Sequence, residues 1–366
     1  MKVLHLGKFC PPTEGGIETF SYDLIEKLNS IGIKADLLCF GNQTINSRYR
    51  NFNYYACKMN MRLNSAPISL EFIKKFLDIE ANYDIIHIHS PNPLAEILSI
   101  YSRRKVIIHW HSDIVKQKLL YSFYKPIQKK ALQKAEKIIV TSPQYLNTSE
   151  QLKDYKQKAT IVQLALNTKR LDINDESKNE IKKVLNIMNN KKIVLAIGRL
   201  VEYKGFEYLI KASKYLNDDL IVIIIGGGPL YYQLRKKINN EKLNDRVFLL
   251  GRVNNVSSYM KYCDLFCLPS ISRNEAFGLV LVEALYFGKP LVTTNVEGSG
   301  MNYVNINDET GLIVPPKNSK ALADAINKIF ADENRYKKLK ENAFKRFKEF
   351  DIDSVTDKII NIYNNI

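Results

Sequence analysis

The chain alternates short apolar runs with longer amphipathic segments along most of its length. Two of the runs, KIVLAIG at 192–198 and LIVIIIGG at 220–227, are apolar at nearly every position rather than at every second position. Strands that are buried on both faces have this composition, and helical connections between them produce parallel sheets. We therefore predict an α/β protein whose parallel sheets are covered by helices on both faces.

The apolar runs fall into two series, which predicts two doubly wound, Rossmann-like domains. The first series covers 2–7, 35–40, 83–89, 105–111, 137–142 and 159–164. The second series covers 192–198, 220–227, 246–251, 264–270, 290–294 and 311–316. The polar stretch 167–180 is the predicted linker. We expect domains at 1–166 and 167–350, and a last helix at 351–366 that packs back on the first domain.

Composition narrows the class of partner. The 366 residues include 54 Lys or Arg and 38 Asp or Glu, which gives a net charge of +16. Such an excess favours nucleic acid, an anionic membrane surface or a phosphorylated ligand. The five cysteines form no CxxC pair, and Cys263 and Cys267 are expected to be buried free thiols. No apolar run approaches the ~20 residues of a membrane span, so we expect a reduced, cytoplasmic protein.

Ligands of doubly wound sheets bind beyond the carboxyl ends of the strands, and in two-domain forms between the domains. The first predicted strand is followed by CPPTEGGIETF, in which Gly15 and Gly16 open a helix. Glycine amides at a helix N-terminus favour an anion, and a tight strand-to-helix turn is the alternative interpretation. The turn IIIGGGPLYYQL, with Gly226 and Gly228, allows the same two interpretations.

Two further turns carry charged side chains. In AIGRLVEYKGFEYLI, Arg199 and Lys204 flank the turn after a predicted strand. A forked guanidinium and a compact ammonium suit a diphosphate better than a neutral ligand. Two ordinary surface cations are the alternative interpretation.

The stretch SRNEAFGLVLVEALYFGKP places Glu275 and Glu283 on either side of an apolar run. Gly278 is unfavourable inside a helix, so the helix is predicted to begin near Phe277 or Gly278, with its first amides, up to Leu279, free for an anion. Glu283 then lies about 8 Å further along the axis, at ~1.5 Å per residue. Carboxylates at both ends and amides between them suit a nucleotide-sugar. The alternative is an acid that offsets the helix dipole and another on a solvated face.

The ordered set of motifs resembles the retaining glycosyltransferases of family 4. Those enzymes have the GT-B fold, in which two Rossmann-like domains face each other across a cleft. The resemblance rests on E-x7-E with F-G inside it, on Arg199-x4-Lys204, on Gly15–Gly16, on the Gly226–Pro229 turn and on CDLFCLPS. It covers nearly the whole chain, and it implies an N-terminal acceptor domain and a C-terminal nucleotide-sugar domain.

The resemblance also implies roles for single residues. Glu283 would bind the donor ribose, Glu275 the transferred sugar, and Arg199 with Lys204 the diphosphate, with Val253 near the base. The expected donor-binding residues are Gly15, Gly16, Arg199, Lys204, Gly226, Gly228, Val253, Glu275, Ala276, Phe277, Gly278, Leu279 and Glu283. The expected catalytic residues are His111, Glu275, Arg199 and Lys204, and the expected acceptor-binding residues are His89, His111 and Asp113.

Four of the five histidines form two H-x-H pairs, His87 with His89 and His109 with His111. We expect the members of each pair to face opposite sides of their strands, with His87 and His109 in the core. A shared metal ion is therefore not expected, and no cofactor is expected beside the nucleotide-sugar substrate. By resemblance, HWHSD places His111 next to the reacting carbon.

The implied reaction is α-retaining transfer by attack from the front face, in which the departing diphosphate oxygen takes the proton of the acceptor. Cations and helix dipoles, rather than a metal ion, would stabilise the leaving group. The only Asp-x-Asp sequence lies at a predicted helix boundary near the C-terminus, at 351–353.

Residues 103–137 hold ten Lys or Arg against two acids, interspersed with apolar and aromatic residues. This mixture suits contact with an anionic membrane surface, and family members that use polyprenyl-diphosphate-linked acceptors dock in this way. The expected membrane-facing residues are Lys116, Lys118, Tyr121, Phe123 and Lys125. The alternative is a solvated helix whose apolar face packs on the sheet.

HIHSPNPL, HWHSDI and GSGMNYVN look most like the mannosyltransferases of O-antigen assembly. The leading hypothesis is thus transfer of mannose from GDP-mannose to a lipid-linked oligosaccharide at the inner face of the cell membrane. A UDP-sugar donor is the first alternative, and a nucleotide-sugar epimerase of the same fold is the second. A basic nucleic-acid-binding protein is the third, but the chain lacks a recognition motif, so no nucleic acid is expected.

Overall fold

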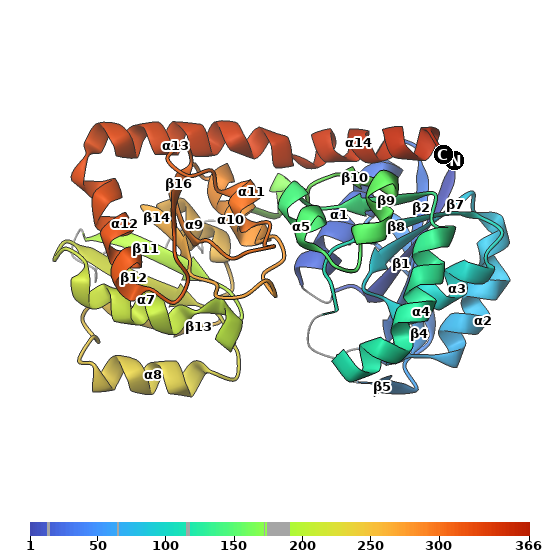
Figure 1. The fold of residues 1–366 in the computed structure, drawn as a ribbon, viewed down its shortest axis with the longest axis horizontal. Helices are drawn as coiled ribbons and strands as arrows, with labels where there is room; N and C mark the ends of the chain where they lie inside the picture. Colours follow the sequence, from blue (N-terminus) through green and yellow to red (C-terminus); the bar gives the residue numbers. More distant parts are fainter. Residues whose placement is uncertain (13–14, 64–65, 115–117, 172, 174–190) are drawn as a thin grey trace. The chain divides into compact units, whose positions relative to one another are not determined.

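The computed structural model describes residues 1–12, 15–63, 66–114, 118–171, 173 and 191–366. The chain forms two compact units (Figure 1). Unit 1 contains Met1–Leu166 and Ile352–Ile366, and unit 2 contains Asn167–Asp351. Most of the predicted linker, 167–180, lies outside the described residues.

Unit 1 is built on a sheet of eight strands. Their spatial order is β10 (Ala159–Ile161), β9 (Lys137–Val140), β8 (Lys105–Trp110), β7 (Ile85–Ser90), β1 (Lys2–Phe9), β2 (Lys34–Gly41), β4 (Phe52–Lys58) and β3 (Ile45–Tyr49). All neighbours are parallel except β3 and β4. The sequence analysis missed β3, β4 and a separate small hairpin of β5 (Met61–Leu63) and β6 (Ala66–Ile68).

Helices cover this sheet in the manner of a Rossmann-like domain. They are α1 (Gly16–Ser30), α2 (Leu70–Ile79), α3 (Pro93–Tyr101), α4 (Lys118–Lys134), α5 (Pro143–Thr148) and α14 (Ile352–Asn364). The last helix, α14, packs against α1. The ammonium of Lys27 lies 2.7 Å from the carboxylate of Asp353, and the hydroxyl of Tyr363 hydrogen-bonds to His87.

Unit 2 is built on a sheet of six strands, all of them parallel. Its spatial order is β13 (Val247–Gly251), β12 (Leu220–Ile225), β11 (Lys192–Ile197), β14 (Leu265–Leu268), β15 (Leu291–Thr294) and β16 (Gly311–Val314). Its helices are α7 (Phe206–Ala212), α8 (Tyr231–Asn240), α9 (Val256–Tyr262), α10 (Leu279–Tyr286), α11 (Met301–Val304), α12 (Ser319–Ala331) and α13 (Glu333–Phe347). The central strands β12 and β14 are buried at every position, as predicted for strands covered on both faces.

The direction of winding reverses once in each sheet. In unit 1 the reversal lies between β1 and β7, and in unit 2 it lies between β11 and β14. Loops diverge at such a point and leave a crevice at the carboxyl edge, where ligands of α/β sheets bind. The prediction of two Rossmann-like parallel sheets is confirmed, and the two reversal points show where to look for a site.

The cysteines differ from the prediction of a fully reduced chain. Cys10 and Cys39 form a disulfide because they lie near the carboxyl ends of the paired strands β1 and β2, with Cα atoms 5.3 Å apart. Cys57, Cys263 and Cys267 are free and buried, which confirms the prediction for the last two.

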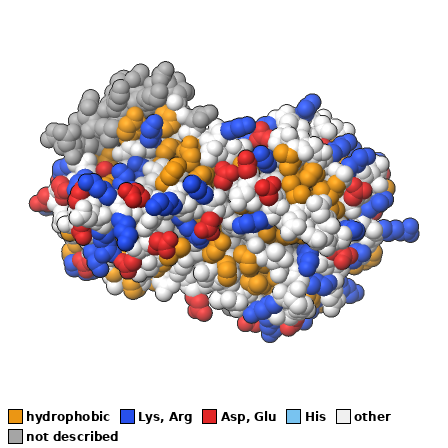
Figure 2. Space-filling view, turned by 90° about the horizontal axis from the view of Figure 1, so that it is seen from above, with side chains coloured by type: hydrophobic (Ala, Val, Ile, Leu, Met, Phe, Trp, Pro, Cys, Tyr) orange, Lys and Arg blue, Asp and Glu red, His pale blue; other side chains and the backbone are white. Residues whose placement is uncertain are grey.

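The surface carries charge of both signs. On the face seen in Figure 2, Lys and Arg side chains are interspersed with Asp and Glu, and the apolar side chains form separate small groups. Among the described helices, none is long and apolar enough to cross a membrane.

Candidate active site

The charged residues predicted in unit 2 come together at the reversal point of its sheet. Arg199 and Lys204 follow β11, and Glu275 follows β14, which is the neighbour of β11. Because the carboxyl ends of parallel strands lie at one edge, these loops are adjacent. The amide of Ile271 donates to the carbonyl of Tyr203 at 2.7 Å and joins the two loops directly.

Lys204 and Glu275 form an ion pair that is almost shielded from water. The ammonium lies 2.5 Å from Oε2 of the carboxylate, and each residue is only 8% exposed. The hydroxyl of Ser270 donates to the same oxygen at 3.2 Å. Burial acts to lower the pKa of Lys204, but the Glu275 carboxylate, helped by Tyr203, more than offsets this effect, and the pKa is raised above its ordinary value. The sequence analysis gave the two side chains to different parts of a ligand, whereas the structure pairs them.

The loop that carries Glu275 is held by the segment that follows β15. The hydroxyl of Ser299 donates to the backbone carbonyl of Glu275, and the amide of Gly300 donates to that of Ala276 at 2.7 Å. A Cβ at Gly300 would lie 2.8 Å from the Ala276 oxygen, so the close approach requires glycine. Sequence reasoning missed both supports, because a G-S-G sequence signals only a turn.

The helix start predicted beside Gly278 is confirmed. Gly278 has φ 82° and α10 begins at Leu279. Among the described residues, the amides of Phe277, Gly278 and Leu279 have no hydrogen-bond acceptor. Glu283 lies in the second turn and is half-buried. This end of α10 therefore presents amides and the positive end of the helix dipole to an anion.

The structure bears on the two interpretations that the sequence left open for the glycines after β12. A Cβ at Gly226 would lie 1.9 Å from the carbonyl oxygen of Gly198, and one at Gly228 would lie 2.5 Å from that of Leu200. The amide of Gly226 donates to the carbonyl of Gly251 at 2.8 Å. The close approach is thus to neighbouring backbone, which favours the interpretation of a packed turn.

The other predicted donor residues in unit 2 lie along the same edge. Arg199 is exposed, and Val253, which follows β13, is half-buried. The loops that carry Val253, Gly226, Arg199 and Glu275 follow β13, β12, β11 and β14, which are successive strands. In the predicted assignment, the loop with Val253 would therefore meet the base, the loop with Arg199 the diphosphate and the loop with Glu275 the sugar. The glycine turn at Gly226 lies between the first two of these loops.

In unit 1, an acid already lies at the predicted anion site of α1. A Cβ at Gly15 would lie 2.3 Å from Oε2 of Glu18, so this carboxylate covers the glycine. Burial raises the pKa of Glu18, while a hydrogen bond from its own amide and the charge of Lys8 oppose the rise. Glu18 must move if a phosphate is to occupy the space beside Gly15, whereas nothing lies within 4 Å of a Cβ at Gly16. Sequence reasoning missed it, although an acid in the first turn is a common signal.

The histidines correct the sequence analysis. His87, His89, His109 and His111 all lie on one face of the sheet with His5, and each is at most 2% exposed. The expectation of opposite faces is wrong because residues two apart in a strand point the same way. His87 and His109 are in the core as predicted, but so are His89 and His111.

Asp113, predicted to bind the acceptor, has structural partners. Its Oδ1 accepts hydrogen bonds from Nε1 of Trp110 at 3.0 Å and from the hydroxyl of Ser149 at 2.7 Å. Its amide donates to the hydroxyl of Tyr145. These contacts fix the segment that follows β8 and carries His111.

A buried carboxylate that sequence reasoning missed lies beside this segment. Glu96 on α3 is fully buried and accepts from the hydroxyl of Ser90 at 2.7 Å, from the amide of Asn92 at 3.2 Å and from the hydroxyl of Tyr124. Burial and the Glu96 charge raise the pKa of Tyr124. The acid thus ties α4 to the loop after β7.

The predicted membrane-facing residues differ in exposure. Phe123 is 82% exposed and Lys125 is exposed, whereas Tyr121 is half-buried and donates to Gln128 at 3.0 Å. Lys116 and the side chain of Lys118 lie outside the described residues. Beside Phe123 is an apolar groove of about 420 Å³. It is lined by Leu63, Ala66, Pro67, Ile68, Pro93, Leu94, Ile97, Ile114, Tyr121, Phe123, Tyr124 and Ile127.

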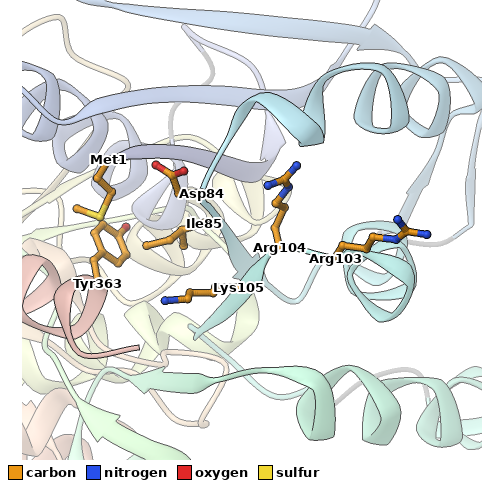
Figure 3. Close-up of a pocket in the computed structure, with 7 residues that line it drawn as sticks. All are labelled: Met1, Asp84, Ile85, Arg103, Arg104, Lys105 and Tyr363. Carbon is orange, nitrogen blue, oxygen red and sulfur yellow. The ribbon is translucent and has the colours of Figure 1, made fainter.

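Another cavity, of about 500 Å³, lies at the amino-terminal edge of the unit 1 sheet. Figure 3 shows Met1, Ile85 and Tyr363 close together there, with Arg103 directed away from them. The cavity adjoins the amino ends of β1, β7 and β8. Ligands of parallel sheets bind at the carboxyl ends, so we assign this cavity no role.

Two family models match most of the chain. Glycosyltransferase Family 4 matches residues 14–170, and Glycosyl transferases group 1 matches residues 177–346. The O-antigen chain mannosyltransferase C of Escherichia coli is 32% identical over 374 residues, which cover 100% of this chain and 99% of the relative. The chain belongs to the family 4 glycosyltransferases.

A second relative agrees with the assignment, and two solved structures agree with its fold. D-rhamnosyltransferase WbpZ of Pseudomonas aeruginosa is 28% identical over 95% of this chain and 92% of its own. The crystal structure of HepE from Anabaena in complex with UDP matches with a TM-score of 0.81, 19% identity and full coverage of both chains. WaaG, a glycosyltransferase involved in lipopolysaccharide biosynthesis, matches with a TM-score of 0.75, 16% identity and coverage of 98% and 99%. The fold of this glycosyltransferase is GT-B, as the sequence predicted.

Proposed function

We propose that this glycosyltransferase moves mannose from GDP-mannose to a lipid-linked oligosaccharide in O-antigen synthesis, with retention of configuration. The full-length relative from Escherichia coli is an O-antigen chain mannosyltransferase, which supports the sugar and the class of acceptor. The observation that carries the proposal is the buried Lys204–Glu275 pair beside the open amides of α10. A UDP-sugar donor is the alternative.

The donor would lie along the carboxyl edge of the unit 2 sheet. The exposed guanidinium of Arg199 and the amides of Phe277, Gly278 and Leu279 suit the diphosphate. One oxygen of Glu275 is held by Lys204 and Ser270, and the other is left for a hydroxyl of the transferred sugar.

Lys204 would stabilise the leaving group. Its raised pKa keeps the ammonium charged throughout the neutral range, and it is fixed in place by Glu275 before any ligand binds. Preorganised charge of this kind stabilises a departing diphosphate without a change in the protein. Because its charge is compensated by Lys204, Glu275 is poorly suited to act as the nucleophile of a double displacement. We therefore favour attack from the front face, with the departing oxygen taking the proton of the acceptor hydroxyl.

The acceptor would bind to unit 1, near His111. Its lipid part and the membrane surface would meet the apolar groove and the exposed side chains of Phe123 and Lys125 on α4. A relative from Campylobacter jejuni is named for an acceptor linked to diphospho-undecaprenol, and it is 34% identical over 44% of this chain.

Thermal unfolding with added donors tests the proposal. GDP-mannose should raise the unfolding temperature, because a ligand at a hundred times its Kd adds about 2.7 kcal/mol to the folded state. UDP-glucose and UDP-GlcNAc should have little effect, and Arg199→Ala should abolish the response to GDP-mannose. A response to a UDP-sugar alone would overturn the choice of donor. Release of free sugar in the absence of any acceptor would instead indicate an epimerase.

A further inference from the structure

All five histidines of the chain lie in one buried cluster in unit 1. His5 on β1 pairs in register with His87 on β7, and His89 pairs with His109 on β8. His111 follows directly after β8, and its amide donates to the carbonyl of Ser90 at 3.0 Å. The rings occupy the same face of three adjacent strands, next to the reversal point of the sheet.

The rings form two hydrogen-bonded rows. In the first row, Nδ1 of His5 lies 3.1 Å from Nε2 of His89, and Nδ1 of His89 lies 3.0 Å from Nε2 of His111. Ring centroids in both pairs are 5.3 Å apart, with interplanar angles of 23° and 12°. Neighbouring imidazoles therefore meet edge to edge in nearly one plane, which is the geometry of an N–H···N hydrogen bond.

The second row contains Tyr363, His87 and His109. The hydroxyl of Tyr363 lies 2.6 Å from Nδ1 of His87, and Nε2 of His87 lies 3.3 Å from Nδ1 of His109. The two rows stack on each other, with centroids 4.6 Å apart for His5 and His87 and 4.3 Å apart for His109 and His111. Stacking holds the rings in place, but no hydrogen bond between described side chains joins the second row to the first.

The first row couples the tautomers of its three rings. Burial lowers the pKa of every histidine in the cluster, so each ring is neutral and has one N–H and one lone pair. His89 uses both nitrogens, so it donates to one neighbour and accepts from the other. If His89 carries its proton on Nδ1, His5 and His111 must do so as well; the reverse arrangement places all three protons on Nε2.

The two ends of the row differ in their surroundings. Nε2 of His5 and Nδ1 of His111 are buried and have no hydrogen-bond partner among the described residues. A buried N–H without an acceptor is less well tolerated than an unused lone pair. His5 lies in the middle of β1, whereas His111 lies just beyond the carboxyl end of β8, the edge at which ligands of parallel sheets bind. The N–H therefore belongs at the His111 end.

We propose that His5 and His89 are positioning residues that hold His111 in the Nδ1–H tautomer, so that it donates a hydrogen bond to a sugar hydroxyl. The inference rests on the proposed function, which places His111 at the substrate. Neither His5 nor His89 touches the substrate; both act through His111.

A transition-metal site is the competing interpretation. The ring nitrogens of His5, His87 and His89, and those of His89, His109 and His111, lie within 4.8 Å of one another. A metal ion requires several lone pairs directed to one point, about 2.0–2.1 Å from each nitrogen. In the first row, each inner ring nitrogen faces a nitrogen of the next ring instead.

Ring-¹⁵N NMR of the full-length protein tests the proposal, since the chain has only five histidines to assign by single substitution. We expect His5, His89 and His111 to show the Nδ1–H tautomer, which is the less common form of free histidine. His89→Phe, which keeps an aromatic ring in the stack, should remove this signature from His111. His87→Phe, in the second row, should leave it unchanged. An Nε2–H proton on His111, or a signature that survives His89→Phe, would overturn the proposal, as would stoichiometric zinc, nickel or copper in the purified protein.

Kinetics separate positioning from mere packing. His89→Phe should lower kcat at least about tenfold and change KM less than about threefold. His89→Asn should restore part of the loss, because its amide replaces Nδ1 as a donor to His111; equal activity of the two variants would count against the idea. Full activity of His111→Ala would refute the role of His111 in the proposed function, while the tautomers measured by NMR would still report on the row itself.

Discussion

The ammonium of Lys204 lies 2.5 Å from the carboxylate of Glu275, and the pair is nearly buried where the unit 2 sheet reverses its winding. The two residues come from neighbouring loops, so each holds the other in place before a donor binds. This relationship changes what is expected of both residues. A side chain that only faces a ligand can be removed with little loss of stability, whereas half of a buried ion pair cannot.

We predict that Glu275→Ala and Lys204→Met each abolish transfer and also lower the free energy of unfolding of unit 2, by about 3–5 kcal/mol. The reason is the unpaired charge that remains after either substitution. Chemical denaturation of both variants measures the loss.

The double variant Lys204→Met/Glu275→Leu supplies the control for this prediction. It leaves no buried charge, so it should recover part of the lost stability while transfer stays absent. If Glu275→Ala is as stable as the wild type, the pair contributes nothing to the fold and the structural argument is wrong.

Acid should unfold unit 1 selectively. The pKa of each of the five histidines is lowered by burial, to about 3 for His89. Below about pH 6.5 the unfolded chain takes up protons that the folded chain does not, so stability is lost as the pH falls. Each histidine contributes up to about 1.4 kcal/mol per pH unit, and five together about 7 kcal/mol per pH unit. Domains are stable by about 5–15 kcal/mol, so we expect unfolding near pH 5.

The fluorescence of Trp110 measures this transition. It is the only tryptophan of the chain, it is fully buried in β8, and unit 2 contains no histidine. His87→Phe removes one titrating group, so the transition of a folded variant should be less steep and lie at lower pH. A tryptophan signal that stays native down to pH 4 would contradict the linkage argument.

The sequence predicted the central strands and the motif loops because their signals are local. A run such as LIVIIIGG is typical of a buried strand with a turn after it, and Gly278 marks the start of α10 because its φ is positive. The strand β3 was missed because it is largely exposed and polar, and β4 was missed because fewer than half of its positions are buried. Spacing also cannot show what a motif residue contacts. Lys204 and Glu275 are far apart in the chain, and their pairing depends on the adjacency of β11 and β14.

The prediction about the histidines was wrong for a different reason. The side-chain direction along a strand follows from its period of two, so the common face of each H-x-H pair was available from the sequence. The join between His5 and His89 was not, because it requires β1 to lie beside β7, and these strands are separated by five others of the chain. Glu96 was missed for the same reason, because its partners come from other elements of the fold. Ser299 was missed because its sequence signals only a turn, and Glu18 because an acid in the first turn signals only a cap.

Two glycine substitutions separate a packed turn from a ligand contact. Gly226→Ala should destabilise unit 2 by more than about 2 kcal/mol, because its Cβ would overlap the carbonyl oxygen of Gly198 and its φ is 149°. Gly16→Ala should leave the fold intact, since nothing lies within 4 Å of its Cβ. Thermal unfolding compares the two, and the KM for the donor then shows whether Gly16 meets the diphosphate. A stable Gly226→Ala variant would refute the packed-turn interpretation.

If α4 contacts the membrane, substitutions on α4 should weaken membrane binding more than similar substitutions elsewhere on the surface. Phe123 is 82% exposed beside an apolar groove, and Lys125 is exposed on the same helix. An interfacial contact combines an inserted aromatic side chain with basic residues near anionic lipid, worth about 1 kcal/mol per charge. Phe123→Ser with Lys125→Glu should therefore lower binding to phosphatidylglycerol vesicles at least about tenfold in a sedimentation assay.

The matched control is Phe344→Ser with Lys345→Glu on α13, where Phe344 is 52% exposed. Equal losses in both double variants would show that binding follows net charge and not this surface.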